Sequence, residues 1–211
     1  AGKSAIDENK THYPPVPGYP ELRKAISGKF KKENGLEFAP EQIVVSAGAK
    51  QSIANAILCL LNPGDEIIVP VPYWVSYREL IKLAGAVPVY LPTSIDTNFK
   101  VTPEQLEKAI NAKTKLFIFS SPCNPSGTVY TKDELKALAD VFAKHKNVHI
   151  ISDEIYEYIN FVGKHESIAQ FDEIKDRVIV INGVSKGYAM TGWRVGYMGT
   201  TKEIAKACDK M

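Results

Sequence analysis

The sequence predicts an α/β fold of three layers, in which helices cover both faces of a mostly parallel sheet. Short apolar runs typical of strands alternate with helical patterns of roughly 10 to 14 residues. Some runs, such as residues 178–181, are apolar throughout, as in strands that are buried on both faces. The chain contains no internal repeat and no low-complexity tract.

The composition is that of an ordinary globular protein and excludes several function classes. The chain has 211 residues, 45% of them hydrophobic and 24% charged, which suits either one large domain or a domain with appendages. A net charge of +2 gives no reason to expect nucleic acid or a membrane surface as a partner. No apolar run approaches the roughly 20 residues that would span a bilayer. We find no signal peptide, and because the chain opens at Ala1 we expect an earlier segment to precede it.

The cysteines argue against a disulfide framework and against a metal site. Cys59, Cys123 and Cys208 are odd in number and lie at long spacings, which fits neither paired disulfides nor zinc ligands. We therefore expect no metal and a reducing compartment, the cytoplasm.

The N-terminal part predicts an arm followed by a helix. Residues 1–19 lack hydrophobic periodicity and are rich in proline, so we expect an extended arm. The large domain is expected over residues 20–211. Pro20 suits the first turn of a helix, in which an apolar residue recurs every four positions until Gly35 ends it.

Two strand–helix units come next. A strand at residues 43–45 leads through small residues into a helix that ends at the sequence Asn-Pro-Gly of residues 62–64. A strand at residues 66–69 precedes a helix over residues 73–84, and Gly85 is its C-terminal stop.

Capping boxes mark the later helices. Helices over residues 102–111 and 131–144 each open with threonine followed three residues later by Gln or Glu, and Pro103 suits the first helical position. Strands at residues 87–91 and 116–119 precede them.

The C-terminal part predicts three further strands, at residues 148–151, 178–181 and 195–198. A box beginning at Thr200 opens a last helix, which reaches Met211 without a stop signal. We therefore expect that the chain has been cut before the protein ends.

Ligands in such sheets bind beyond the carboxyl ends of the strands, so the residues that follow each strand are informative. Gly48, Ala49 and Lys50 open a helix, where free amides beside an ammonium suit a phosphate, although small residues also permit a tight turn. Trp74 follows the next strand and offers an aromatic face, for which core packing is the alternative.

Two later strands also end in polar residues. Asn124 lies between two prolines, where turn chemistry alone is an alternative. Asp153 ends an apolar strand, where it could equally be an N-cap, and Tyr156 follows three residues later.

A single lysine follows the strand at residues 178–181. Lys186 lies among small residues, which suits a Schiff base with a carbonyl cofactor, whereas a lone lysine is more often a salt-bridged surface residue. Arg194 comes eight residues later, between Gly192 and Gly196.

Together these residue types fit pyridoxal phosphate. Lys186 would bond the aldehyde and move the substrate proton, and Asp153 would hold the pyridine nitrogen protonated. Arg194 would bind the phosphate. Tyr156 and Asn124 would hydrogen-bond the ring oxygen, and Trp74 would stack on the ring.

The chain also resembles a known family, the class I, fold-type I pyridoxal-phosphate aminotransferases of the aspartate aminotransferase group, and most of all its bacterial subgroup. The motifs that carry this resemblance occur in family order along nearly the whole chain. They are Tyr13-Pro-Pro-Val-Pro-Gly-Tyr-Pro-Glu-Leu-Arg23, Ala47-Gly-Ala-Lys50-Gln51, Pro72-Tyr-Trp74-Val-Ser-Tyr77, Ser121-Pro-Cys-Asn124-Pro-Ser-Gly127, Ser152-Asp153-Glu-Ile-Tyr156-Glu, Val184-Ser-Lys186 and Gly192-Trp-Arg194-Val-Gly-Tyr197.

The resemblance implies further roles. Tyr13 matches a tyrosine that reaches the phosphate of the neighbouring subunit, which implies a homodimer with composite active sites. Lys50 matches a position near both the phosphate and the distal carboxylate of acidic substrates, and either role is open. Trp74 and Asn124 are expected to contact the substrate as well as the cofactor.

Two features depart from the family pattern. Many relatives have a phosphate-binding serine where this chain has Gly183, and Ser185 would compensate only in part. The small domain, with its arginine for the substrate α-carboxylate, and the N-terminal segment that closes over the substrate are both expected to lie outside this chain. We therefore expect the large, cofactor-binding domain of a longer enzyme, which alone would transaminate poorly.

The sequence thus predicts an aminotransferase that shuttles an amino group between L-amino acids, with aspartate and glutamate foremost, and their 2-oxo acids. The alternatives are another fold-type I enzyme, such as an aromatic or prephenate aminotransferase, a β-lyase or a decarboxylase. A pyridoxal-phosphate-binding regulatory module is a further alternative, which an upstream basic helix-turn-helix domain would reveal.

Overall fold

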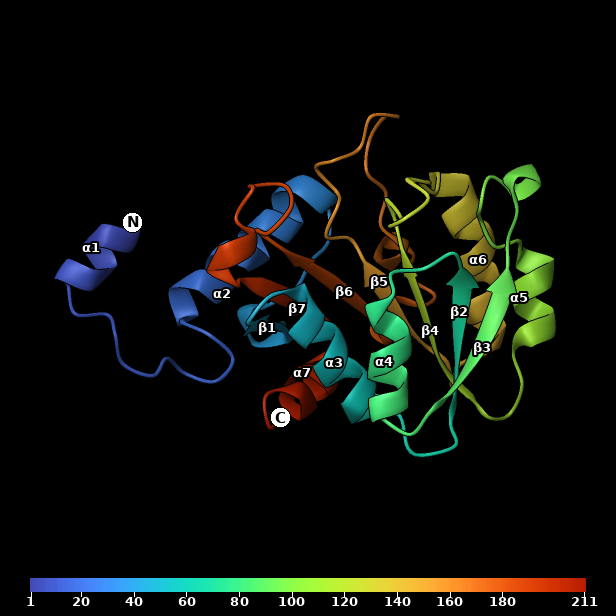
Figure 1. The fold of residues 1–211 in the computed structure, drawn as a ribbon, viewed down its shortest axis with the longest axis horizontal. Helices are drawn as coiled ribbons and strands as arrows, with labels where there is room; N and C mark the ends of the chain where they lie inside the picture. Colours follow the sequence, from blue (N-terminus) through green and yellow to red (C-terminus); the bar gives the residue numbers. More distant parts are fainter.

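A computed structural model describes all residues from 1 to 211 and shows one seven-stranded sheet between two layers of helices (Figure 1). The strand order is β1-β7-β6-β5-β4-β2-β3. Strands β3, β2, β4, β5 and β6 run parallel, whereas β7 is antiparallel to both β6 and β1. The strands are β1 Ile43–Ser46, β2 Glu66–Val71, β3 Val87–Pro92, β4 Thr114–Ser120, β5 His149–Asp153, β6 Val178–Gly183 and β7 Gly196–Gly199. The predicted three-layer fold with a mostly parallel sheet is confirmed.

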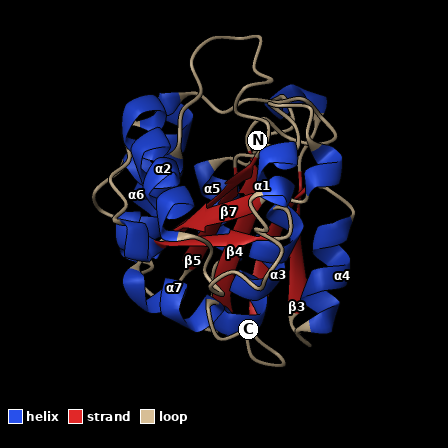
Figure 2. Cartoon of the chain, turned by 90° about the vertical axis from the view of Figure 1, so that its left-hand side faces the viewer, coloured by secondary structure: helices blue, strands red, loops and turns tan.

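The helices pack on the two faces of the sheet and create two apolar cores (Figure 2). Helices α2, α5 and α6 contribute to one core, and α3, α4 and α7 to the other. The helices are α1 Gly2–Asp7, α2 Pro20–Lys29, α3 Ala49–Leu60, α4 Ser76–Leu83, α5 Pro103–Ala109, α6 Lys132–Lys144 and α7 Lys202–Cys208, and a π-helical turn, Phe30–Asn34, continues α2.

The apolar runs of the central strands supply both cores at once. In β4, Phe117 and Phe119 belong to the core beneath α6, whereas Leu116 and Ile118 belong to the core beneath α3. Successive side chains of a strand point to opposite faces, so a strand between two helical layers must be apolar at every position. This is why these strands appear in the sequence as unbroken apolar runs.

Both predicted capping boxes in the middle of the chain are present. The Thr102 hydroxyl accepts a hydrogen bond from the Gln105 amide at 3.3 Å, and the Thr131 hydroxyl accepts one from the Glu134 amide at 3.3 Å. In each case the third residue reaches back to the threonine amide, as the box requires.

The last predicted box was wrong by one residue. The N-cap of α7 is Thr201, whose hydroxyl accepts from the Ile204 amide at 3.4 Å. Thr200 is fully buried and donates its hydroxyl to the Val178 carbonyl at 3.2 Å, so it is not free to cap a helix.

Two other predictions need correction. Residues 2–7 of the expected extended arm form helix α1, whose Ser4 hydroxyl donates to the Glu8 carboxylate at 2.7 Å. Helix α4 begins at Ser76 and not at Tyr73, because the Tyr73 ring stacks on Tyr90 of β3, 5.4 Å between centroids.

The carboxyl ends of the central strands lie side by side. Ser120 at the end of β4 pairs with Asp153 at the end of β5, and Asp153 pairs with Ile181 near the end of β6. The loops that follow these strands are therefore held together at one edge of the sheet. The three cysteines are free thiols, and none of the helices has both the length and the apolarity to cross a membrane.

Candidate active site

A cavity of about 200 Å³ lies at the carboxyl ends of the strands and collects most of the predicted site residues. Those that line it are Ala49, Lys50, Trp74, Asn124, Asp153, Tyr156, Ser185, Lys186 and Arg194. Gly48 lies beside it against Arg194, whereas Tyr13 is fully exposed on the arm and contributes nothing to the cavity within this chain. The sheet has thus brought together residues that are up to 145 positions apart in the chain, Ala49 and Arg194 being the outermost pair.

Asp153 is the buried acid of the site. It is 4% exposed, and burial raises the pKa of its carboxyl from an ordinary value of 3.8 to about 6, although hydrogen bonds from Tyr77 and the Ile155 amide lower it part of the way. The Tyr77 hydroxyl donates to Oδ2 at 2.7 Å, and the Ile155 amide makes a long contact to Oδ1 at 3.4 Å. The N-cap alternative is excluded, because no helix begins at Asp153.

Lys186 faces the cavity without an acidic partner. It takes part in none of the salt bridges of the structure, which excludes the salt-bridged surface lysine considered above. Its ammonium lies 5.6 Å from the ring centre of Tyr156, and the Tyr156 hydroxyl accepts a hydrogen bond from the Asn124 amide at 3.2 Å. An amine, a phenol and an amide therefore converge on one cavity, as the sequence predicted.

Arg194 and the start of α3 form a positively charged corner. Arg194 has a left-handed backbone with φ of 54°, which a non-glycine residue adopts only where surrounding structure holds it. Its guanidinium donates to the Thr191 carbonyl at 2.8 Å and to the Ala47 carbonyl at 3.2 Å. Because Gly48 is the N-cap of α3, the free amides of the first helical turn lie next to this guanidinium, which suits a phosphate.

Lys50 and Trp74 occupy another wall of the cavity. The Lys50 ammonium lies 5.0 Å from the centre of the Trp74 ring, within the range of a cation–π interaction. Lys50 also lines a neighbouring open groove together with Arg78, so its charge remains accessible.

The departure at Gly183 has a steric explanation. A Cβ on this residue would lie 2.8 Å from the Val195 carbonyl oxygen and 3.0 Å from the Cα of Gly196. A serine would therefore require the strands β6 and β7 to shift apart. Ser185, two residues later, lines the cavity and is 8% exposed.

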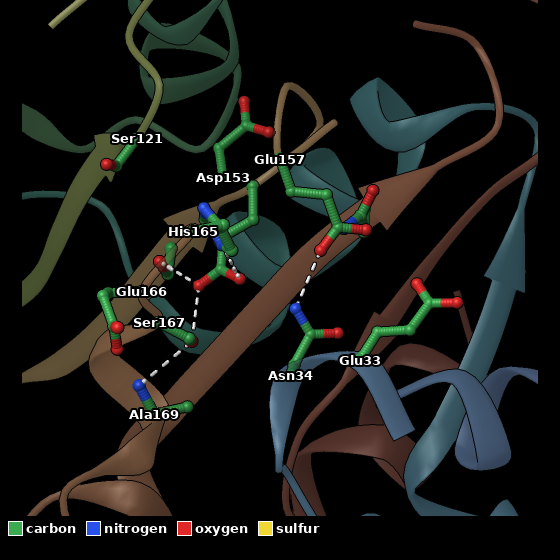
Figure 3. A network of polar contacts seen from close by, with 12 residues as sticks. Glu33, Asn34, Ser121, Asp153, Glu157, His165, Glu166, Ser167 and Ala169 are labelled. Carbon is green, nitrogen blue, oxygen red and sulfur yellow. Dashed lines mark hydrogen bonds and ion pairs between the residues drawn. The ribbon is translucent and has the colours of Figure 1, made fainter. Parts of the chain in front are cut away.

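A buried polar network holds the turn that carries Asp153 and Tyr156 (Figure 3). The Glu154 carboxylate is 1% exposed and accepts hydrogen bonds from Ser152 at 2.8 Å and Ser167 at 2.6 Å, and it pairs with His165 at 2.8 Å. Burial by itself would lower the pKa of His165, but the hydrogen bond and charge of Glu154 raise it above its ordinary value. Every oxygen of Glu154 therefore has a partner.

The same turn is tied to the N-terminal helices. The Glu157 carboxylate forms an ion pair with Lys29 of α2 and accepts a hydrogen bond from the Asn34 amide at 2.8 Å. The turn after β5 is thus fixed from two sides, which limits the movement of Asp153 and Tyr156.

Sequence reasoning missed the contribution of three hydroxyl-bearing residues that line the cavity, Tyr77, Ser120 and Thr191. Tyr77 comes three residues after Trp74, and this spacing was the available signal. Although α4 begins only at Ser76, the two rings do meet, 5.6 Å between centroids. Ser120 could have been found as the last residue of an apolar strand.

Comparison with known proteins identifies the family to which the chain belongs. The family model for "Aminotransferase class I and II" matches residues 1–211. The chain is 49% identical over 212 residues to a bifunctional aspartate aminotransferase and glutamate/aspartate-prephenate aminotransferase of Petunia hybrida, covering 100% of this chain and 44% of that protein. It is 49% identical over 209 residues to an aspartate/prephenate aminotransferase of Cereibacter sphaeroides, covering 98% and 52%.

Solved structures show the same fold. The aspartate aminotransferase of Rhizobium meliloti superposes with a TM-score of 0.97 at 40% identity, covering 99% of this chain and 52% of the other. That of Thermus thermophilus with maleate gives a TM-score of 0.95 at 42% identity, covering 99% and 54%. The chain spans about half the length of the relatives it matches. Because the family model matches the chain along its whole length, the chain belongs to the class I and II aminotransferase family.

Proposed function

We propose that this chain is the cofactor-binding domain of a pyridoxal-phosphate-dependent aminotransferase, with aspartate, glutamate and their 2-oxo acids as substrates. The observation that carries the proposal is the unpaired Lys186 amine, which faces a cavity also lined by Asp153 and Arg194. Membership of the class I and II aminotransferase family implies this cofactor.

The donor set fits the functional groups of pyridoxal phosphate. Lys186 offers an amine for the aldehyde, and Asp153 offers a buried carboxylate for the ring nitrogen. Arg194 and the amide end of α3 offer a guanidinium and free N–H groups for the phosphate. Trp74 offers an aromatic face for the ring.

When bound, pyridoxal phosphate supplies an aldehyde that accepts the amino group and a ring that withdraws electrons from the substrate Cα. Lys186 would hold the cofactor through its aldehyde carbon, and its free amine would accept the proton from the substrate Cα. Asp153 keeps a proton on the ring nitrogen. Tyr156 and Asn124, which are already hydrogen-bonded to each other, orient the ring oxygen.

The proposed substrates rest on two supports. Relatives are named aspartate and aspartate/prephenate aminotransferases, and the Thermus thermophilus structure holds maleate, a dicarboxylate. In this chain, Lys50 provides an accessible cation at the wall of the cavity that a second carboxylate would use.

The working form is proposed to be a homodimer. Tyr13 is fully exposed in the segment that joins α1 to α2. Figure 1 shows that this N-terminal part of the chain extends away from the sheet, where the tyrosine is available to the phosphate of a neighbouring subunit. Of the four arginines, only Arg194 lines the cavity; Arg23 and Arg177 bind backbone carbonyls elsewhere. Without a second guanidinium for the substrate α-carboxylate, residues 1–211 alone should transaminate poorly.

Borohydride reduction tests the lysine assignment directly. The chain is incubated with pyridoxal phosphate, which should produce an absorbance band that shifts with pH; it is then reduced and digested, and the modified peptide is identified by mass. The label should be on Lys186 and should be absent from the variant Lys186→Ala. The control variant Lys50→Gln, which removes the other lysine of the cavity, should still be labelled at Lys186. Equal labelling of wild type and Lys186→Ala would overturn the assignment.

A further inference from the structure

The Tyr77 hydroxyl makes the strongest contact to the Asp153 carboxylate. Tyr77 is 1% exposed, and its hydroxyl donates to Oδ2 at 2.7 Å in a wholly buried hydrogen bond. The other oxygen, Oδ1, has only the 3.4 Å contact with the Ile155 amide. One carboxylate oxygen is thus firmly held, and the other keeps its capacity to accept a hydrogen bond.

Packing fixes the position of this hydroxyl. The Tyr77 ring meets the Trp74 ring edge to face, with 5.6 Å between centroids and an interplanar angle of 88°. The Tyr73 ring is nearly parallel to it, at 6.5 Å and 11°. Helix α4 buries Tyr77 and Ile81 against the sheet, so the phenol has little freedom to turn away from Asp153.

A buried carboxylate needs such a donor to stay ionised. Removal from water favours the neutral acid, and a hydrogen bond donated to the charged form opposes this effect. Tyr77 itself is an unsuitable proton acceptor, because burial, and then the charge of Asp153, raise the pKa of its hydroxyl well above the ordinary value. The proton of this hydrogen bond therefore stays on the tyrosine.

We propose that Tyr77 is a positioning residue that keeps Asp153 ionised and holds its carboxylate so that Oδ1 accepts the N–H of the cofactor ring. The inference rests on the proposed function and adds a residue to it. It predicts that Tyr77 matters only for ligands that carry a ring nitrogen.

The test compares two ligands that differ at one ring atom. Dissociation constants of pyridoxal phosphate and of its 1-deaza analogue, which has C–H in place of the ring nitrogen, are measured by equilibrium dialysis. Tyr77→Phe should weaken pyridoxal phosphate binding by about tenfold, because it removes a hydrogen bond to a charged group. The dissociation constant of the analogue should change by less than about twofold. Tyr130→Phe removes the hydroxyl of another buried tyrosine, which binds the Val101 amide, and should change neither constant.

A variant that is only partly folded does not spoil the comparison, because both ligands need the same fold and their ratio is independent of the folded fraction. A double-mutant cycle adds a second measurement: in Asp153→Asn, the further change Tyr77→Phe should have no effect on pyridoxal phosphate binding. Equal weakening of both ligands by Tyr77→Phe would overturn the proposal and leave Tyr77 a packing residue. Wild-type protein without a Lys186 adduct would instead refute the proposed function itself.

Discussion

The guanidinium of Arg194 occupies the space that a side chain on Gly48 would need. A Cβ at Gly48 would lie 2.1 Å from Nη2 of Arg194, and Gly48 has a φ of 87°, which side-chain-bearing residues rarely adopt. The glycine is therefore required both by its own backbone and by the arginine that faces it.

Gly48→Ala should displace Arg194 and strain the entry to α3. We expect a loss of about 1–3 kcal/mol in the free energy of unfolding, measured by denaturant titration, and a fall of about tenfold in pyridoxal phosphate affinity. Gly28→Ala, within α2 and with open space around it, is the matched control and should be neutral or slightly stabilising. If the two variants were equally stable, the steric argument would be wrong.

Arg194→Gln should show which residue binds the phosphate. We expect pyridoxal phosphate affinity to fall tenfold to about a hundredfold while pyridoxal, which has no phosphate, is bound almost unchanged. Lys50→Gln is the comparison, because Lys50 lines the same cavity but lies over Trp74. If Lys50→Gln changes pyridoxal phosphate affinity by less than about threefold, Lys50 does not bind the phosphate and is assigned to the substrate carboxylate. A fall as large as that of Arg194→Gln would assign it to the phosphate.

Asp153 should make the cofactor-free protein less stable as pH rises. Its folded-state pKa, about 6, lies above the ordinary 3.8, so the stabilisation is present below about pH 4 and is lost as pH rises through about 6. The rise of the Asp153 pKa on folding corresponds to roughly 3 kcal/mol in the free energy of unfolding. The free energy of unfolding of wild type minus that of Asp153→Asn should fall by about this amount between about pH 4 and about pH 7. Asp140→Asn, at an exposed position, should not reproduce the trend, and a flat wild-type difference would contradict it.

Glu154→Gln should destabilise the turn beneath the site. The substitution keeps the shape of the side chain but removes the charge that binds His165 and the two serine hydroxyls. We expect a loss of about 2–4 kcal/mol in the free energy of unfolding, since a buried charge pair is broken. Glu203→Gln, on the exposed side of α7, should change it by less than about 0.5 kcal/mol. Similar losses in both variants would show that the network contributes little.

The sequence by itself determined the layered fold and the types of residue at the site. Hydrophobic periodicity and capping boxes are local signals, so the strands and the helices beginning after Thr102 and Thr131 were predictable. The rule that ligands bind at strand ends then selected Asp153 and Lys186, which do share one cavity.

Only the tertiary structure decided which of these residues touch and which hydroxyls remain free. Tyr77 and Asp153 are 76 positions apart, and their hydrogen bond depends on how α4 packs against the sheet. Thr200 and Thr201 are equivalent as sequence signals, yet the first is bound to Val178 and the second caps α7. Local patterns specify elements, whereas contacts between elements depend on packing across the sheet, which no short stretch of sequence contains.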